Sequence, residues 1–494
     1  MKYFIGVDIG TTATKAVLFD EKKVQVCKSE KGYKLYRDVT GKAEEDPEEI
    51  FLAVIETISK LTKILNQNDE LLAVSFSSQM HSLIAMNKNW EKLTNLITWA
   101  DTRSDKFAQK LKAQPDAQGI YERTGTPIHP MTPLSKILWL RGEKNEIFEK
   151  TAHFLDIKGY IFWRLFAVNK IDLSVASGTG LLNNQILDWD SELLSLSGIS
   201  KDLLPVIVSP YEYEVSIEQG FAEEMGVSKQ TGFIWGAGDG PLANLGVSAI
   251  DTGQVALTIG TSGAIRSVTE KPQVDSKGRT FSYALDAEHW VTGGPVTSGG
   301  DVFRWLQEEI FEKKYSFDDL TTLASTVPAG SNGLIFHPYL GGERAPLWDA
   351  DARADFYGLN YSHKPAHLAR AILEGIVFNL SEVAEGLGEI NEIFATGGFT
   401  QSELWLQILS DIFDKPIKIS QSSEAGCLAA VIMAEKALGL TSKLESPENV
   451  VRILQPIQKN VIIYQELSLI YHSLTVQLQP LFRKISNFQK KYSN

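Results

Sequence analysis

Cysteine is scarce in this sequence. The two cysteines, Cys27 and Cys427, lie in opposite halves of a 494-residue chain, and neither belongs to a CxxC pair. A disulfide framework needs several paired cysteines, and a structural zinc site needs clustered thiolates or imidazoles. Apolar runs are short as well, since no uncharged stretch is long enough to cross a bilayer. Disulfide scaffolds, zinc modules and helical membrane spans are therefore not expected.

Positive charge is also in short supply. The 48 lysines and arginines are outnumbered by 61 aspartates and glutamates, which gives a net charge of −13 at pH 7. A chain with this balance repels a phosphate backbone unless it has a local basic stripe, and the sequence contains none. The basic tail residues Arg483, Lys484, Lys490 and Lys491 are expected at a solvated, frayed chain end. Neither a nucleic acid nor a membrane is expected as a partner.

The opening stretch, MKYFIGVDIG, does not fit a secretory signal. Asp8 interrupts its apolar run, so the cytoplasm is the expected location. The composition, with 43% hydrophobic and 22% charged residues, is that of a folded globular protein. A chain of 494 residues exceeds what one hydrophobic core usually holds, which predicts two domains.

Short apolar runs alternate with helical patterns along the chain. Residues 3–7 and 16–19 are apolar and flank a turn of small residues, which predicts a β-hairpin. Asp46 and Pro47 fit the N-cap and the first residue of a helix, because apolar residues recur at helical spacing after them. Another β-type run covers residues 72–76. This alternation predicts an α/β fold with mixed sheets.

The same plan recurs in the second half. Residues 255–259 and 264–268 flank a Gly-Thr-Ser-Gly turn, as the first two strands flank theirs. A repeated strand, Gly-Thr turn and strand is what an internal duplication leaves. The boundary is therefore expected near residues 246–253, with a first domain over 1–248 and a second over 249–494. Helices are predicted over 365–383, 402–413 and 424–438.

The two turns carry groups that can hold a phosphate. Small residues leave backbone amides uncovered, hydroxyls donate hydrogen bonds, and a carboxylate can face magnesium. The candidates are Asp8, Gly10, Thr11, Thr12 and Lys15 in the first turn and Gly260 and Thr261 in the second. An ordinary hairpin turn is the alternative for either one alone, but a pair can grip a nucleoside triphosphate from both walls of a cleft. Neither turn fits the P-loop or the Rossmann glycine pattern.

A third glycine-rich bend, residues 234–241, holds one carboxylate, Asp239, before a predicted helix. The positive end of that helix favours the ionised form of the carboxylate. An ionised Asp239 can accept a proton from a sugar hydroxyl while the hydroxyl oxygen attacks a γ-phosphate. The alternative is an N-cap aspartate without a catalytic role.

Polar residues follow two apolar runs, at positions where loops commonly meet the hydroxyls of a polyol. The candidates for sugar contact are Gln79, Met80, His81, Trp99 and Asp101. Taken singly, His81 fits a structural histidine and Trp99 fits a core residue. These two alternatives stay open at the level of the sequence.

Two later glycine pairs have different expected roles. Gly397 and Gly398, ahead of a helix capped by Ser402, let the backbone approach a flat ligand such as adenine, although a plain turn is equally compatible. The Glu343–Arg344 pair, which follows another double glycine, is interpreted as a structural latch rather than a catalytic unit.

Taken together, these residues resemble the FGGY family of carbohydrate kinases over essentially the whole chain. The motifs that carry the resemblance follow the family's order and cover residues 8–15, 79–81, 99–103, 136–139, 236–239, 260–263, 341–359 and 396–405. The sequence departs from the family pattern at Pro241, after Asp239, and at Gly142. Both departures concern local geometry rather than the class of protein.

The resemblance implies an α/β protein of two actin-like ATPase (ribonuclease H-like) domains that flank a catalytic cleft, with ATP and Mg²⁺ as cofactors. The sugar is then bound mainly by the first domain and the nucleotide mainly by the second. Asp239 matches the family's catalytic base, and Asp8 matches a carboxylate near the magnesium and the γ-phosphate. The other matches are the phosphate turns (Gly10, Thr11, Thr12, Lys15, Gly260, Thr261), the adenosine region (Gly397, Gly398, Ser402) and the sugar region (Gln79, Met80, His81, Trp99, Asp101).

Within the family, residues 97–101, 123–130 and 258–266 are similar to the gluconate kinases of Gram-positive bacteria, which implies phosphorylation of D-gluconate to 6-phospho-D-gluconate. A xylulokinase-like pentulose kinase is the alternative, because residues 79–81 are also similar to that branch. A non-catalytic ATP-dependent sensor of actin-like fold is an alternative of another class, but it has no need of Asp239.

A sugar acid needs a cation for its carboxylate. The candidates in the sequence are Arg103, Lys136, Lys158 and Arg266. The expected partners are a small-molecule sugar or sugar acid as substrate and a second copy of the chain in a homodimer.

Overall fold

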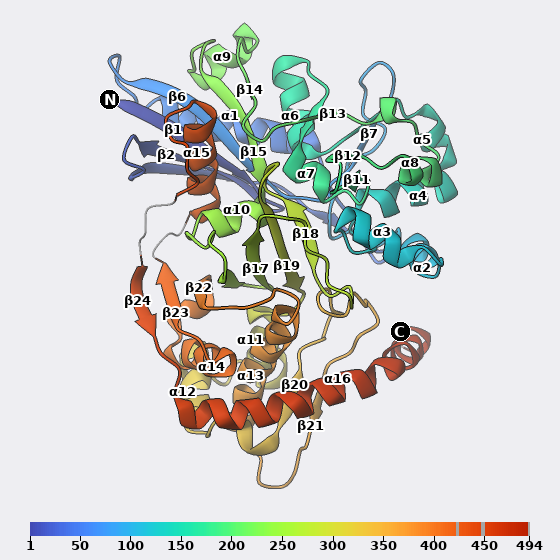
Figure 1. Cartoon of the computed structure of the whole chain (residues 1–494), viewed down its shortest axis with the longest axis vertical. Coiled ribbons are helices and arrows are strands. Elements are labelled where there is room, and N and C mark those ends of the chain that lie inside the picture. Colours follow the sequence, from blue (N-terminus) through green and yellow to red (C-terminus); the bar gives the residue numbers. More distant parts are fainter. Residues whose placement is uncertain (421–423, 446–449, 493–494) are drawn as a thin grey trace.

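The computed structural model describes residues 1–420, 424–445 and 450–492. Its largest elements are two mixed β-sheets, one from each half of the sequence (Figure 1). The strands of the first sheet lie in the order β14 (Tyr213–Glu214), β15 (Gly232–Gly238), β6 (Glu70–Ser78), β1 (Lys2–Ile9), β2 (Ala13–Asp20) and β3 (Gln25–Gly32). Strand β1 pairs antiparallel with β2 and parallel with β6. The predicted N-terminal hairpin is therefore confirmed.

The second sheet repeats this arrangement. Its strands lie in the order β18 (Phe281–Ala284), β19 (Trp290–Val296), β17 (Gly263–Thr269), β16 (Gln254–Ile259), β22 (Glu392–Thr396), β23 (Ile417–Ser420) and β24 (Val450–Leu454). Strand β16 pairs antiparallel with β17 and parallel with β22. Each half thus begins with a hairpin, as the repeated sequence plan predicts, and adds a parallel strand beside it.

Shorter strands form small sheets outside the two large ones. They are β4 (Tyr36–Arg37), β5 (Ala43–Glu45), β7 (Ile84–Met86), β8 (Leu96–Ile97), β9 (His153–Leu155), β10 (Lys170–Asp172), β11 (Leu182–Asn183), β12 (Asp188–Trp189), β13 (Val206–Val208), β20 (Ile335–His337) and β21 (Asp355–Tyr357). Most of them belong to the first half, where they pair with one another in two- and three-stranded sheets.

Helices connect the strands and cover the sheets. In the first half they are α1 (Pro47–Thr62), α2 (Asp105–Lys112), α3 (Ala117–Thr124), α4 (Pro133–Glu143), α5 (Asn145–Lys150), α6 (Ile157–Phe166), α7 (Leu173–Ser177), α8 (Ser191–Ser197), α9 (Gln219–Met225) and α10 (Asp239–Leu245). In the second half they are α11 (Gly300–Trp305), α12 (Phe317–Ser325), α13 (Pro365–Ala384), α14 (Glu403–Phe413), α15 (Ala425–Ala437) and α16 (Gln458–Tyr492). Asp46 caps α1 by accepting a hydrogen bond from the Glu48 amide at 3.0 Å, as predicted.

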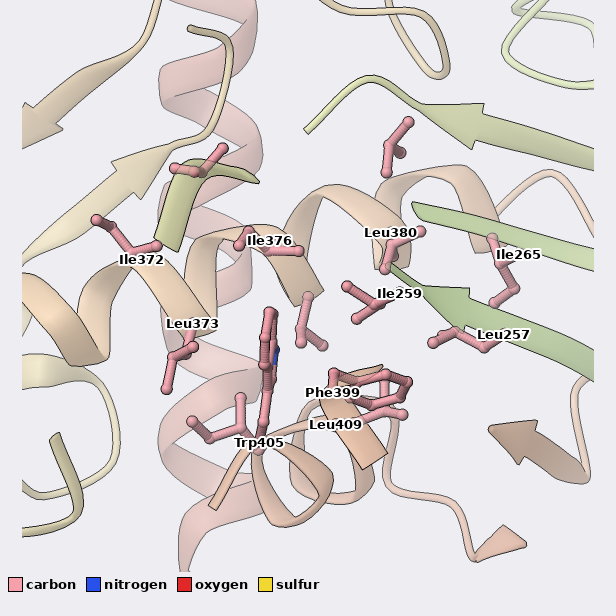
Figure 2. Packing of buried hydrophobic residues seen from close by; sticks show 14 of the residues in the cluster. Leu257, Ile259, Ile265, Ile372, Leu373, Ile376, Leu380, Phe399, Trp405 and Leu409 are labelled. Atoms are coloured by element: carbon pink, nitrogen blue, oxygen red, sulfur yellow. The ribbon is translucent and has the colours of Figure 1, made fainter. Parts of the chain in front are cut away.

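The core of the second domain lies between its sheet and helices α13 and α14 (Figure 2). Strand β16 contributes Leu257 and Ile259, whose side chains share a face because alternate strand residues point the same way. Helix α13 contributes Leu373, Ile376 and Leu380 at helical spacing. Burial of these side chains is the main force that holds the helix against the sheet.

The C-terminal tail is helical, and the prediction of a frayed end is wrong for residues up to 492. Helix α16 runs for 35 residues along the second domain (Figure 1). Tyr464 and Tyr471 are buried against Phe378 of α13, and Lys490 pairs with Asp351 at 2.8 Å. Among the described residues, no helix is both long enough and apolar enough to cross a membrane.

Helix α15 comes from the second half of the sequence but packs on the sheet of the first (Figure 1). It crosses β1 so closely that a Cβ atom at Gly6 would lie 2.0 Å from the carbonyl oxygen of Cys427. Only glycine admits this approach, so the late helix and the first strand are matched to each other. The division into 1–248 and 249–494 stays a prediction, and α15 of the second segment contacts the first sheet.

Replacing Gly6 by alanine tests this contact. The added methyl group would overlap the Cys427 carbonyl group, so α15 must move away from β1, and we expect the free energy of unfolding to fall by about 1–3 kcal/mol. The matched control is Gly32→Ala in β3, where a Cβ would lie 3.6 Å from the nearest atom. Urea denaturation measures both variants. An equal effect of the two substitutions would contradict the packing described.

Candidate active site

Three cavities lie in a row, and each shares a lining residue with the next. The first, of about 380 Å³, is lined by residues of both halves, including Trp99 and Arg344. The second, of about 660 Å³, shares Asp239 with the first. The third, of about 630 Å³, shares Gln401 with the second and is lined by the second half of the chain. A ligand in the third cavity can therefore extend toward the first past Asp239.

The position of Asp239 depends on the bend before it. Gly236 has a φ of +61°, and a Cβ there would lie 1.9 Å from the carbonyl oxygen of Phe76, so this close approach requires glycine. The register of β15 against β6 shifts at this bend. The chain then enters α10 with Gly238 as the N-cap and Asp239 as the first helical residue. Asp239 is therefore not the N-cap, and its carboxylate faces the first and second cavities.

Asp239 and Asp8 are two carboxylates that face the second cavity. Asp239 accepts a hydrogen bond from the Gly240 amide at 2.7 Å, and Asp8 accepts one from the Ser77 hydroxyl at 2.7 Å. Asp239 is open to the cavity, but the surrounding walls of the cleft desolvate it. This desolvation, followed by repulsion from Asp8, raises the pKa of Asp239 to about 6. Water in the open cleft limits the effect, and a ligand that displaces this water strengthens it.

The pKa of Asp8 is also set by opposing effects. Burial raises the pKa of Asp8, while the hydrogen bond from Ser77 and the charge of Lys15 act in the opposite direction. A nearby cation would therefore favour the ionised form of this carboxylate. Because Asp8 lines the second cavity, it is a residue that can hold a metal ion there.

His81 and Trp99 form part of the wall of the first cavity. His81 Nδ1 lies 2.8 Å from the carbonyl oxygen of Gly178 and donates to it, which leaves Nε2 facing the Tyr283 hydroxyl at 3.4 Å. Burial lowers the pKa of His81 to about 3, so its imidazole is neutral. The Trp99 indole donates to the Thr11 hydroxyl at 2.9 Å. The wall is thus uncharged at this place and offers polar groups to a ligand.

The other residues expected around the sugar divide into two groups. Met80 lines the first cavity, whereas Gln79 and Asp101 are buried behind its wall. Gln79 donates to Glu45 at 2.8 Å, and Asp101 accepts from Arg103 Nε at 3.0 Å. These side chains support the wall of the cavity, and their assignment as sugar ligands stays a prediction.

The two turns expected to hold phosphate reach different cavities. Thr11 lines the first cavity, and Gly260 and Thr261 line the third. A Cβ on Gly260 would meet no atom within 4 Å, so its backbone is open to a ligand. Lys15 instead lies 3.8 Å from Glu424. Within the described residues, the linings of the three cavities do not include Gly10, Thr12 or Lys15, whose phosphate role stays a prediction.

The glycine pair expected beside adenine borders two cavities. Gly397 lines the second, while Gly398 and Ser402 line the third. Gly397 has a φ of +103°, and a Cβ there would lie 2.3 Å from the Ile259 carbonyl oxygen, so this turn requires glycine. Aromatic side chains also line the third cavity, namely Phe303, Phe317, Phe399 and Trp405. Their flat faces suit a planar heterocycle.

The Glu343–Arg344 pair, expected to be a latch, has two separate roles. Glu343 is buried and accepts hydrogen bonds from Asn379 Nδ2 at 2.9 Å and from the Arg344 amide at 2.8 Å, as a latch would. The Arg344 guanidinium instead lines the first cavity and lies 5.1 Å from the centre of the Trp99 ring. Sequence reasoning missed this cavity residue, because a loop position does not reveal the direction of its side chain. The available signal was a charged residue beside a double glycine.

Two family models match the chain. Residues 3–246 match the N-terminal domain and residues 255–438 the C-terminal domain of the FGGY family of carbohydrate kinases. The gluconokinase of Bacillus subtilis (strain 168) is 44% identical over 99% of this chain and 98% of that protein. The xylulose kinase of the same organism is 29% identical over 99% of this chain and 100% of that protein.

Solved structures show the same relationship. A crystal structure of gluconate kinase from Lactobacillus acidophilus is 41% identical, with a TM-score of 0.94 over 98% of this chain and 99% of that one. A ligand-bound xylulose kinase from Lactobacillus acidophilus is also 41% identical, with a TM-score of 0.94 over 98% of this chain and 100% of that one. The expected two-domain actin-like fold is confirmed. Matched in both domains and over nearly its whole length, the chain belongs to the FGGY family of carbohydrate kinases.

Proposed function

We propose that this carbohydrate kinase transfers the γ-phosphoryl group of ATP to D-gluconate and releases 6-phospho-D-gluconate and ADP. The observation that carries the proposal is that Asp239 lines both the first and the second cavity. A carboxylate at that junction can contact a sugar hydroxyl on one side and face a phosphoryl group on the other. Full-length identity of 42–44% to two Bacillus gluconokinases supports the choice of sugar.

Asp239 acts as the general base in this proposal. Its carboxylate accepts the proton of the 6-hydroxyl group, and the hydroxyl oxygen bonds to the γ-phosphorus. The bond between that phosphorus and the bridging oxygen then breaks, and ADP leaves. A carboxyl group with a pKa of about 6 is mostly ionised at pH 7 and is still basic enough to take up the proton.

The second and third cavities fit a nucleotide. The aromatic residues of the third suit adenine, and Gly398, where a Cβ would meet no atom within 4 Å, leaves the backbone open to it. Thr261 and Gly397 are the proposed contacts for the phosphates between the two cavities. When bound, Mg²⁺ neutralises phosphate charge, and Asp8 is the residue proposed to hold it.

A pentulose such as xylulose is the second candidate substrate. One solved xylulose kinase is as similar to this chain as the solved gluconate kinase, with the same identity and TM-score. Among the Bacillus subtilis proteins, however, identity falls from 44% for the gluconokinase to 29% for the xylulose kinase. This difference over the full length favours gluconate.

We also propose that two copies of this chain form a homodimer in the cytoplasm. Helix α16 supports a dimer, because Ile462, Leu469 and Val476 recur every seven residues and are 66%, 74% and 55% exposed. Apolar residues at this spacing form a seam that can pack against a second copy of itself. Sedimentation equilibrium should give twice the chain mass, and Leu469→Glu should give the monomer mass. A monomeric wild-type protein would reject the dimer without affecting the proposed reaction.

A substrate panel tests the choice of sugar. Phosphorylation of D-gluconate, D-xylulose, D-ribulose and glycerol is measured by coupled ADP release. We expect kcat/KM for gluconate to exceed the others by at least about tenfold, the ratio that corresponds to about 1.4 kcal/mol of additional binding to a charged group. A higher kcat/KM for xylulose would replace gluconate by the pentulose. Turnover of none of the four would reject both candidates.

Asp239→Asn tests the general base. The amide keeps the shape of the side chain but cannot accept the proton, so kcat should fall by at least about a hundredfold. Calorimetric affinity for ATP should persist, because the proposed nucleotide contacts are untouched. Asp8→Asn is the comparison variant, and its activity should need a higher Mg²⁺ concentration. Near-normal turnover of Asp239→Asn would refute the assignment.

The pH dependence of activity in Asp239→Asn gives an independent test of the general base. Wild-type kcat/KM should fall as the pH drops through about 6, because protonation of Asp239 removes the base, and the residual activity of Asp239→Asn should lack this fall.

Ionisation of Asp239 is required for activity but lowers the stability of the fold. The pKa of Asp239 in the folded protein lies above that of an ordinary aspartate, so the ionised carboxylate costs stability above pH 6. Asp239→Asn should therefore melt no lower than wild type at pH 7.5, and a lower melting temperature would indicate a structural role.

A further inference from the structure

The first cavity holds more positive than negative charge. Among its described lining residues, Arg266 and Arg344 are permanent cations and Asp239 is the carboxylate. His81 adds no charge, because its pKa is lowered to about 3. Burial and then repulsion from Arg266 oppose the attraction of Glu343 and lower the pKa of Arg344 to about 10. An anion between the two guanidinium groups would relieve this repulsion.

Both guanidinium groups can donate hydrogen bonds to a ligand. Each carries five N–H groups. The Nε of Arg266 is buried and has no hydrogen-bond partner in the part of the chain that the structure describes. Arg344 donates from one Nη to the Val296 carbonyl oxygen at 2.8 Å. A buried donor without a partner is unfavourable, so these groups are suited to a ligand with several acceptor oxygens.

The two arginines are held in fixed positions. The Arg344 amide donates to the Thr297 hydroxyl at 3.1 Å, and the guanidinium lies 5.1 Å from the centre of the Trp99 ring. Arg266 extends from β17 past Gly293, where a Cβ would lie only 2.8 Å from its Cγ. Because both side chains are positioned before a ligand arrives, less conformational entropy is lost on binding.

The other cations considered for this task have partners elsewhere. Arg103 Nη2 lies 2.7 Å from Asp101, and Lys158 lies 2.8 Å from Asp172 with both side chains fully buried. Lys136 donates to backbone carbonyl groups, including that of Ile97 at 3.2 Å. None of these three cations is among the described residues that line the first cavity.

We propose that Arg266 and Arg344 together bind the carboxylate of a sugar-acid substrate in the first cavity and so select aldonates over neutral sugars. This inference rests on the proposed function, in which the same cavity holds the sugar beside Asp239. The carboxylate accepts hydrogen bonds from both guanidinium groups and balances the excess positive charge. The hydroxyl group that becomes phosphorylated faces Asp239.

The test compares two ligands that differ at one carbon. D-Glucitol has the hydroxyls of D-gluconate but a CH₂OH group in place of the carboxylate. Calorimetry should show wild-type enzyme binding gluconate at least about thirtyfold more tightly than glucitol, and Arg344→Gln and Arg266→Gln should each reduce this ratio at least about tenfold. The affinity for glucitol and for ATP should change less than about twofold. Arg344→Lys, which keeps the charge but loses the planar fork, should lie between.

A matched control separates lost charge from a disturbed loop. Arg353 follows Arg344 in the same loop but points to α16, where it bonds to Ser486 at 2.8 Å. Arg353→Gln should leave the gluconate-to-glucitol ratio unchanged, and thermal unfolding should show that every variant is folded.

An unchanged ratio in both cavity variants would overturn the inference while leaving the gluconate kinase proposal intact. A loss of affinity for ATP in both Arg344→Gln and Arg266→Gln would assign the arginines to phosphate binding instead. Wild-type enzyme that prefers a neutral sugar would reject the proposed function itself.

Discussion

Electrostatic repulsion inside one cleft is the constraint on which the proposed site depends. Asp8 and Asp239 both face the second cavity, and desolvation by the walls of the cleft, followed by repulsion from Asp8, raises the pKa of Asp239 to about 6. Two arginines face the adjoining cavity, and the buried Nε of Arg266 has no hydrogen-bond partner among the described residues. Such an arrangement is costly in the empty protein, because like charges are enclosed without full pairing. Substrates that bring a metal ion to the two aspartates and a carboxylate to the two arginines would reduce the repulsion in both cavities.

The scaffold holds these groups by close contacts between backbones. At Gly6, Gly236 and Gly397 a Cβ would lie 2.0, 1.9 and 2.3 Å from the carbonyl oxygen of another strand or helix. Each contact fixes one side of the cleft: α15 on β1, the bend that leads to Asp239, and the turn beside the second cavity. Tight packing of this kind leaves the polar residues of the cleft little freedom to relax their repulsion.

Local patterns predicted the parts of the fold that local energetics determine. The β1–β2 hairpin, the N-cap at Asp46 and helix α13 all follow from turn chemistry, capping and apolar spacing within a few residues. Helix α16 was not foreseen, since exposed apolar residues such as Leu469 blur its periodicity. The docking of α15 on β1 depends on a partner at the other end of the sequence, which a local pattern cannot identify.

The site was predictable to a similar degree. Motif order identified Asp8 and Asp239, because carboxylates in glycine-rich turns are conspicuous, and both line the second cavity. Sequence position could not distinguish Gln79, which is buried behind the wall, from its neighbour Met80, which lines the first cavity. Nor could it show that Arg344 turns toward Trp99. Side-chain direction is set by packing in three dimensions, and it decides which polar residues meet a ligand.

In the proposed reaction, one carboxylate at the junction of two cavities, Asp239, serves both substrates. A crystal structure with D-gluconate and a non-hydrolysable ATP analogue tests it most directly. We expect the 6-hydroxyl oxygen to lie within about 2.6–3.2 Å of the Asp239 carboxylate, with the γ-phosphate of the analogue on the far side of that oxygen. Gluconate bound with a different hydroxyl at Asp239, or outside the first cavity, would contradict it.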